Sequence, residues 1–181
     1  MIYIALLRGI NVGGNNKVSM QELKLVFEQA GMKNVKTYIN SGNVLFESDL
    51  ASRTEIAKRL EEVIEAGFGF VVKVLVWDKD SVIALADAVP RAWVDETMRC
   101  NILFLWDEID NPGIINAMPV KAGIDNLQYQ KGALVWSVER KNITKSGMTK
   151  IIGTNIYRQM TIRNSNTLYK LAALATAMAE V

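Results

Sequence analysis

Short apolar runs alternate with amphipathic stretches along the first part of the chain. Residues 2–7 are continuously apolar, which is typical of a strand buried on both faces. Ser19 and Ser52 are each followed three residues later by Glu, and such a capping box marks the start of a helix. The Asn and Gly residues at 40–43 favour the positive φ of a tight hairpin. The pattern predicts strands at residues 2–7, 35–39, 44–46 and 70–77, and helices beginning at Ser19 and Ser52.

The same order of elements restarts after a linking helix at residues 80–89 and a loop that contains Pro90. Asn111-Pro112 is typical of a helix start, and Lys131-Gly132 lies between two strand-like runs, as in a hairpin. The second pattern predicts strands at 102–106, 127–130, 134–138 and 160–163, helices at 112–118 and 146–156, and a terminal helix from Thr167. Because identity between the two parts is low, the repeat rests on element order.

The predicted order, β-α-β-β-α-β in each part, is that of the ferredoxin-like fold, an antiparallel sheet with both helices on one face. The strand at 2–7 shows no polar alternation, so we expect the other part of the chain to cover the second face of its sheet. The sequence therefore predicts an α+β protein of duplicated ferredoxin-like modules packed together, with an extra C-terminal helix. The modules are expected at 1–78 and 101–181, joined by a linking helix and loop at 79–100. The predicted core includes Leu6, Phe27, Phe46, Val74 and Leu103.

The composition indicates a folded protein without a strong overall charge. Of the 181 residues 50% are apolar, the net charge is +2, and the sequence pI is about 8.6. This balance lacks the global basicity of a strong nucleic-acid binder. No apolar run approaches the roughly 20 residues of a membrane helix, and the N-terminal segment lacks the basic region of a signal peptide. The single cysteine, Cys100, fits a reducing compartment, so we expect a cytoplasmic protein that does not bind membranes.

The chain contains no histidine. This absence excludes Ser-His-Asp and Cys-His nucleophile systems and histidine-based zinc sites. An enzyme of this composition would use carboxylates, lysines, tyrosines or a hard metal ion. Asp107, Glu108 and Asp110 carry suitable oxygens for Mg²⁺, but a solvated loop and helix start explain them better. No catalytic residue, metal ligand or cofactor is predicted, and whether the protein is an enzyme stays open at this stage.

Two polar blocks that are distant in the sequence share the same residue types. Residues 8–17 combine arginine and lysine with glycines and asparagines, and residues 163–167 combine an arginine with two asparagines and a threonine. Each block precedes a predicted helix, where unpaired backbone N–H groups and the helix dipole favour an anion. Neither block contains the G-x-x-x-x-G-K-[ST] or G-x-G-x-x-G pattern. We interpret the blocks as phosphate contacts that line one cleft, with a sharp turn and helix capping as the respective alternatives.

Further candidates lie in the first hairpin and at the predicted helix start near residue 146. In the predicted topology the first and third strands are neighbours, which would bring Asn40 and Asn43 to one edge with Arg8, although hairpin chemistry alone also explains the two asparagines. Ser146 carries a hydroxyl between two lysines, and its alternative role is a helix cap. The candidate ligand-binding residues are Arg8, Asn11, Lys17, Asn40, Asn43, Lys145, Ser146, Lys150, Arg163, Asn164, Asn166, Thr167 and Lys170.

These candidates favour a protein that binds a phosphate-bearing ligand, either a nucleotide or a nucleic-acid backbone, in a polar cleft. One alternative is an enzyme for metal-assisted phosphoryl or nucleotidyl transfer, and another is a protein-interaction scaffold. A sequence-specific RNA reader is disfavoured because residues 43–46 lack the aromatic pattern of RNP1 and the tryptophans lie mostly in apolar strands.

Several motifs together resemble the bacterial domain-of-unknown-function family 1697. They are residues 5–14, with Asn16-Lys17-Val18 after them, residues 38–44 and residues 163–167. The resemblance spans nearly the whole chain and implies a duplicated ferredoxin-like fold without an established activity. Ser165 and Ser19 stand where the family usually has Trp and Pro, so an aromatic contact at position 165 is not implied for this chain.

Overall fold

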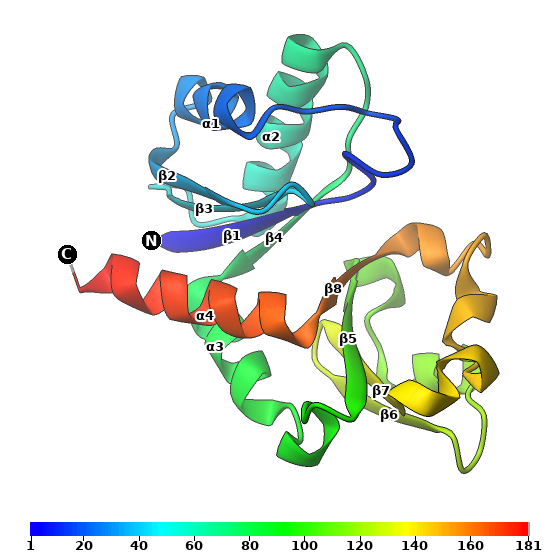
Figure 1. Cartoon of the computed structure of the whole chain (residues 1–181). Helices are drawn as coiled ribbons and strands as arrows, with labels where there is room; N and C mark the ends of the chain where they lie inside the picture. The colour runs from blue at the N-terminus through cyan, green and yellow to red at the C-terminus, as the bar shows by residue number, and fades with distance from the viewer. Residues whose placement is uncertain (181) are drawn as a thin grey trace. The chain divides into compact units, whose positions relative to one another are not determined.

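The computed structural model describes residues 1–180, which form an α+β fold with two four-stranded antiparallel sheets (Figure 1). The strands are β1 (Ile2–Leu7), β2 (Lys33–Tyr38), β3 (Asn43–Glu47), β4 (Val74–Asp78), β5 (Met98–Leu105), β6 (Asp125–Gln130), β7 (Ala133–Glu139) and β8 (Met160–Asn164). The α-helices are α1 (Met20–Gln29), α2 (Arg53–Phe68), α3 (Lys79–Ala88) and α4 (Ser165–Ala179). Short 3₁₀ helices are η1 (Arg91–Trp93), η2 (Asp107–Ile109), η3 (Pro112–Ala117), η4 (Arg140–Lys145), η5 (Met148–Ile151) and η6 (Tyr157–Gln159).

The chain divides into two compact units, each with one sheet. The first unit is Met1–Ile83 together with Lys170–Val181, and the second is Ala84–Tyr169. The strand orders are β2-β3-β1-β4 and β6-β7-β5-β8, so the strands correspond one to one when they are taken in chain order. The prediction of two similar modules is confirmed at this level.

In the first unit, α1 and α2 cover one face of the sheet (Figure 1). Ser19 and Ser52 cap these helices as predicted, since their hydroxyl oxygens accept hydrogen bonds from the N–H groups three residues later, at 3.4 and 3.2 Å. Strand β1 is buried on both faces. The α1 and α2 core cluster consists of Leu23, Phe27, Ile56, Leu60 and Ile64 packed on Tyr3, Ala5, Leu7, Val44, Phe46, Val74 and Val76. Ile4, Leu6 and Leu45, on the other face, are also fully buried.

In the second unit, 3₁₀ helices replace the two helices that the pattern predicted. The predicted helix at 112–118 is η3, which begins at Pro112 as expected. The predicted helix at 146–156 is wrong, because the chain forms η5 and then leaves helical geometry at Ile152. Gly147 there packs against the Pro119 carbonyl, so close that a Cβ atom would lie 1.6 Å from its oxygen. A contact between distant residues thus overrides the local helical pattern.

The predicted core is confirmed in both units. Leu6, Phe27, Phe46, Val74 and Leu103 are at most 1% exposed. Trp136 and Trp77 are buried in strands as expected, whereas Trp93 and Trp106 are only partly buried. Among the described residues, no helix combines the length and the apolar character that crossing a membrane requires.

Candidate functional site

The predicted candidates between residues 8 and 43 lie at one end of the first unit's sheet, where β1 ends and β3 begins. Strands β1 and β3 pair antiparallel, and the Leu7 amide donates a hydrogen bond of 2.8 Å to the Gly42 carbonyl. The glycine loop, residues 8–17, and the hairpin turn, residues 38–43, therefore share this end. We call these two segments together the rim. The structure brings Arg8, Asn11, Lys17, Asn40 and Asn43 onto it.

The Asn11 carboxamide ties the two segments of the rim together. Its Nδ2 donates hydrogen bonds to the Asn40 carbonyl at 2.9 Å and to the Val18 carbonyl at 3.0 Å. Its Oδ1 accepts a hydrogen bond from the Val18 amide at 2.8 Å. Asn11 has a φ of 54°, a left-handed conformation that Asn tolerates better than most residues. The side chain thus acts first as a brace that fixes the loop against the turn.

Gly42 lets the hairpin turn pack against the glycine loop. Its φ is 79°, and a Cβ atom would lie 2.8 Å from both Leu7 Cβ and Ile10 Cδ1. Asn43 is fully buried, and its Nδ2 donates hydrogen bonds of 3.0 Å to the Tyr38 carbonyl and to Ser41 Oγ. The turn-forming role considered for this asparagine is therefore present in the structure.

The outer part of the glycine loop presents unused hydrogen-bond donors. The loop is closed internally by hydrogen bonds from the Asn11 amide to the Asn16 carbonyl and from the Asn15 amide to the Val12 carbonyl, both 3.1 Å. Within residues 1–180, the amide groups of Gly13, Gly14, Asn16 and Lys17 donate no hydrogen bond, and all four residues are exposed. The Lys17 ammonium forms no ion pair with another described residue. Four exposed residues of a braced loop thus have amides without an acceptor in the described residues, and one of them also carries a cation.

Most side chains of the block at residues 163–167 are buried or form hydrogen bonds within the second unit. Asn164 Oδ1 accepts a hydrogen bond of 2.8 Å from the Thr167 amide, so Asn164 caps α4. Arg163 is 7% exposed, and its guanidinium donates hydrogen bonds of 2.9 Å to Thr161 Oγ1 and the Ile162 carbonyl. Burial lowers the pKa of Arg163 to about 10, so the side chain is still charged at neutral pH. Thr167 is buried, whereas Asn166 is exposed.

Ser146 is part of a clasp around Asp125. The Ser146 hydroxyl donates to Asp125 Oδ1 at 2.5 Å, and the Gly147 and Lys121 amides donate to Asp125 Oδ2 at 2.8 Å. Burial opposes ionisation of Asp125, but these hydrogen bonds outweigh it and hold the pKa of the carboxyl below its ordinary value. The buried Trp136 indole N–H lies near this carboxylate without reaching hydrogen-bond geometry. Lys145 and Lys150, on either side of the clasp, are exposed.

A family described as protein of unknown function, DUF1697, matches residues 1–135, which include the whole rim. The chain belongs to this family. A solved structure, that of the conserved bacterial protein SP0830 from Streptococcus pneumoniae, is similar at 28% identity with a TM-score of 0.83. The similarity covers 96% of this chain and 98% of that one. None of the curated proteins matches the chain.

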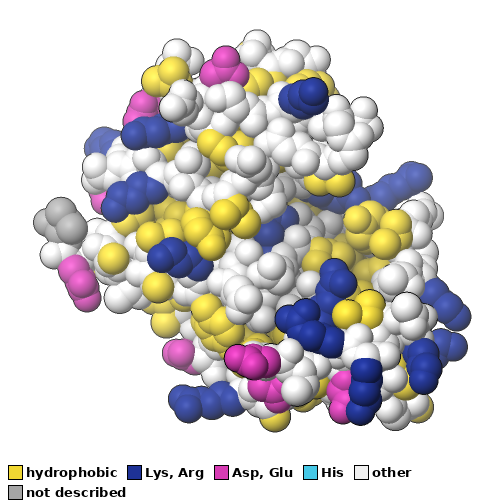
Figure 2. All heavy atoms as spheres, in the orientation of Figure 1, with side chains coloured by type: hydrophobic (Ala, Val, Ile, Leu, Met, Phe, Trp, Pro, Cys, Tyr) yellow, Lys and Arg dark blue, Asp and Glu magenta, His cyan; other side chains and the backbone are white. Residues whose placement is uncertain are grey.

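The predicted site residues of this DUF1697 member are distributed over the two units. Those of the rim, together with Lys170, belong to the first unit, and the remaining candidates belong to the second. That the two polar blocks line one cleft stays a prediction. On the face drawn in Figure 2, lysine and arginine side chains of the first unit, at the top, are interspersed with acidic and uncharged side chains.

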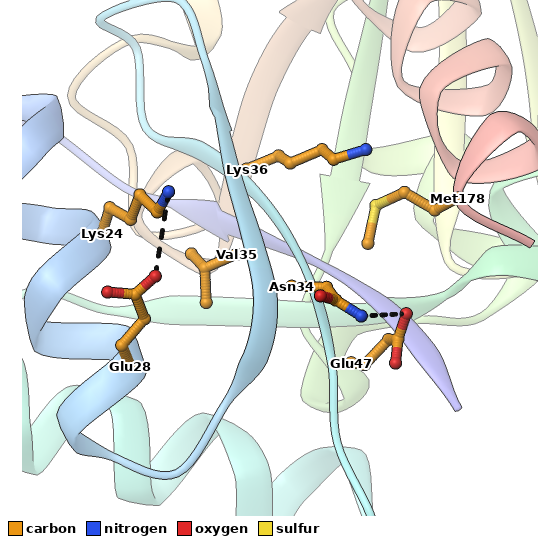
Figure 3. Close-up of a pocket in the computed structure, with 7 residues that line it drawn as sticks. All are labelled: Lys24, Glu28, Asn34, Val35, Lys36, Glu47 and Met178. Atoms are coloured by element: carbon orange, nitrogen blue, oxygen red, sulfur yellow. Dashed lines mark hydrogen bonds and ion pairs between the residues drawn. The ribbon is translucent and has the colours of Figure 1, made fainter. Parts of the chain in front are cut away.

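A groove of about 660 Å³ lies elsewhere in the first unit of this DUF1697 member (Figure 3). Its polar side chains largely satisfy each other, because Lys24 pairs with Glu28 at 3.8 Å and Asn34 donates to Glu47 at 2.9 Å. The groove is lined by Lys24, Glu28, Asn34, Val35, Lys36, Glu47 and Met178. None of these is a predicted site residue. Within residues 1–180, no group of three or more His, Cys, Asp or Glu side chains is arranged to hold a metal ion.

Sequence reasoning missed Gly42 as a contact glycine, Ile39 as a strained residue and Asp125 as the centre of the clasp. Ile39 has a φ of 50°, which β-branched residues rarely adopt. A signal existed only for Gly42, since glycine within an Asn-rich hairpin indicates a special backbone conformation. Two of the three donors to Asp125 lie 21 and 22 positions away, so no local pattern could have shown that it holds Ser146 and Gly147.

Proposed function

We propose that the rim binds the phosphate group of a nucleotide or of a nucleic-acid backbone. The observation that carries the proposal is the set of unused amides at Gly13, Gly14, Asn16 and Lys17 beside the unpaired Lys17 ammonium. Successive backbone N–H groups in turns with left-handed residues form concavities that bind anions. Lysine adds a compact positive charge that suits phosphate oxygens.

The bracing by Asn11 supports this function because it organises the donors before a ligand arrives. A loop that is already held in its bound conformation loses little entropy on binding. The bond from Asn11 to the Asn40 carbonyl and the close packing at Gly42 both serve this purpose. Arg8, at the base of the loop, adds positive charge to the same segment.

Binding of inorganic phosphate and of AMP, followed by calorimetry, tests the proposal. Lys17→Ala should weaken both ligands by about tenfold or more, since a hydrogen bond to a charged group is worth roughly 1.5–3 kcal/mol. Lys58→Ala is the matched control, because Lys58 is an exposed lysine on α2 outside the rim. Absence of binding by the unmodified protein, or equal loss in the two variants, would overturn the proposal.

We further infer that both sheets have the ferredoxin-like arrangement and that the protein acts in the cytoplasm. The shared strand order supports the first inference, although only the first unit carries two α-helices between its strands. The unpaired Cys100 supports the second. An experimental structure in which the two sheets superpose strand for strand, and fractionation of cells that produce the protein, are the corresponding tests.

A further inference from the structure

Two exposed aliphatic residues are sequence neighbours of the residues whose hydrogen bond joins the two segments of the rim. Val12 and Ile39 are 65% and 48% exposed, and they directly adjoin Asn11 and Asn40, whose Nδ2 and carbonyl oxygen lie 2.9 Å apart. Ile10, on the same loop, is by contrast 1% exposed. The rim therefore carries exposed apolar side chains in the same two segments as its polar donors, and neither is among the buried core residues.

The backbone at Ile39 adds a second, independent observation. Its φ of 50° is a left-handed conformation that strains a β-branched residue, while Asn or Gly would adopt it easily in a hairpin turn. Neither the turn nor the core therefore explains an isoleucine at this position. Residues with a strained backbone concentrate at sites that bind ligands, because a functional role can maintain a conformation that lowers stability.

We propose that Val12 and Ile39 contact the base of a nucleotide whose phosphate binds to Lys17 and the unused amides of the glycine loop. This inference rests on the proposed function and specifies its ligand. A nucleotide carries an anionic group next to a flat ring with apolar faces. The rim carries a cation and amide donors next to two aliphatic side chains, so the two chemistries match side by side.

Comparing AMP with ribose 5-phosphate and inorganic phosphate isolates the contribution of the base. AMP should bind about tenfold more tightly than ribose 5-phosphate, since burying the apolar surface of two aliphatic contacts yields a gain of that order. If phosphate and ribose 5-phosphate bind as tightly as AMP, the base contact is overturned while phosphate binding stands. If none of the three binds, the proposed function itself fails and the inference fails with it.

Ile39→Asn tests the same contact from the side of the protein. Asn tolerates the left-handed backbone, so the variant should keep or raise the thermal midpoint while it weakens AMP and leaves ribose 5-phosphate unchanged. Leu25→Gln is the matched control, because Leu25 is 56% exposed on α1 away from the rim. Equal AMP affinity in Ile39→Asn and Leu25→Gln would overturn the proposal.

A short single-stranded oligoadenylate distinguishes a free nucleotide from a nucleotide within a strand. Affinity equal to that of AMP supports a mononucleotide, and markedly higher affinity supports a strand. With either result, the base contact requires that Ile39→Asn lower the affinity for the oligoadenylate. An oligoadenylate affinity that Ile39→Asn leaves unchanged would count against it.

Discussion

Gly42 allows two segments of the rim to pack closely because it has no side chain. In the hairpin turn it combines a φ of 79° with a closest approach of 2.8 Å from a hypothetical Cβ to Leu7 and Ile10. Gly69, which ends α2, has the same φ of 79° but no atom within 4 Å of its hypothetical Cβ. The two glycines therefore separate the cost of backbone conformation from the cost of steric overlap.

We expect Gly42→Ala to lower the free energy of unfolding by about 2–4 kcal/mol, as the sum of a left-handed backbone penalty and overpacking. Gly69→Ala should cost only the first part, about 1–2 kcal/mol. Denaturant unfolding of both variants measures the two costs. Equal losses would show that the neighbours of Gly42 move aside without cost.

Cys100 provides a pH-dependent test of burial. Burial in β5 raises the pKa of its thiol to about 11, only partly offset by a hydrogen bond with Ser165. Because the folded pKa lies above the unfolded value, the neutral thiol stabilises the folded state below the unfolded pKa. This contribution is lost as the pH rises from about 9 towards about 11.

The native thiol should accordingly react slowly with a disulfide reagent at pH 8 and rapidly once the protein is unfolded. Unfolding measured between pH 8 and 10.5 should lose stability more steeply for the unmodified protein than for Cys100→Ala. A fast native reaction, or parallel pH profiles, would contradict the burial of this side chain.

At the scale of elements, the clasp around Asp125 replaces a helix as the support for the segment before β8. Its carboxylate receives hydrogen bonds from Ser146, Gly147 and Lys121. Removing a hydroxyl that satisfies such a group typically costs about 1–3 kcal/mol, so we expect Ser146→Ala to destabilise the protein by that amount. Thr144→Ala, which alters an exposed hydroxyl of the same segment, is the control for urea unfolding.

The pH dependence of the clasp follows from the lowered pKa of Asp125. A carboxyl whose folded pKa lies below its unfolded value stabilises the protein above the ordinary value of 3.8, and the effect is lost as the pH falls through the folded pKa. We therefore expect Asp125→Asn to be less stable than the unmodified protein at pH 6 to 7. The difference should shrink below pH 4, and a difference independent of pH would exclude an ionised clasp.

The sequence pattern correctly predicted the features that interactions between neighbouring residues determine. The caps at Ser19 and Ser52, the hairpin at Lys131-Gly132 and the start of η3 at Pro112 all depend on neighbouring residues. The failure at 146–156 arose where Gly147 packs against Pro119 and bonds to Asp125, contacts that no helical period encodes. At the rim, the sequence indicated polar candidates but not that Asn11 braces the loop, because that role depends on Asn40, which is 29 positions away.

At the scale of the whole chain, the first unit is discontinuous in sequence. Its last segment starts at Lys170, although the whole second unit, Ala84–Tyr169, lies between that residue and Ile83. Leu171, Ala175 and Met178 of this segment are buried. We therefore expect a chain that ends at Tyr169 to have a free energy of unfolding lower by several kcal/mol, since each fully buried apolar side chain contributes about 1.5–3 kcal/mol.

Hydrogen exchange locates this effect. The truncation should lower the protection of amides in β1 and β3 more than that of amides in β5 and β7. A chain ending at Ala179 retains all three buried side chains and serves as the control. Protection that falls equally in both sheets, or in neither, would contradict the assignment of this segment to the first unit.

The discontinuity also has a consequence for synthesis on the ribosome. Strands β1 to β4 leave the exit tunnel first, but the residues that complete their unit follow only after the second unit has been translated. The nascent first sheet must therefore wait with incomplete cover while the later sequence emerges, although domains commonly fold as units in the order of synthesis. Recognition by a chaperone that binds exposed apolar strands should peak during this interval and end when α4 is released.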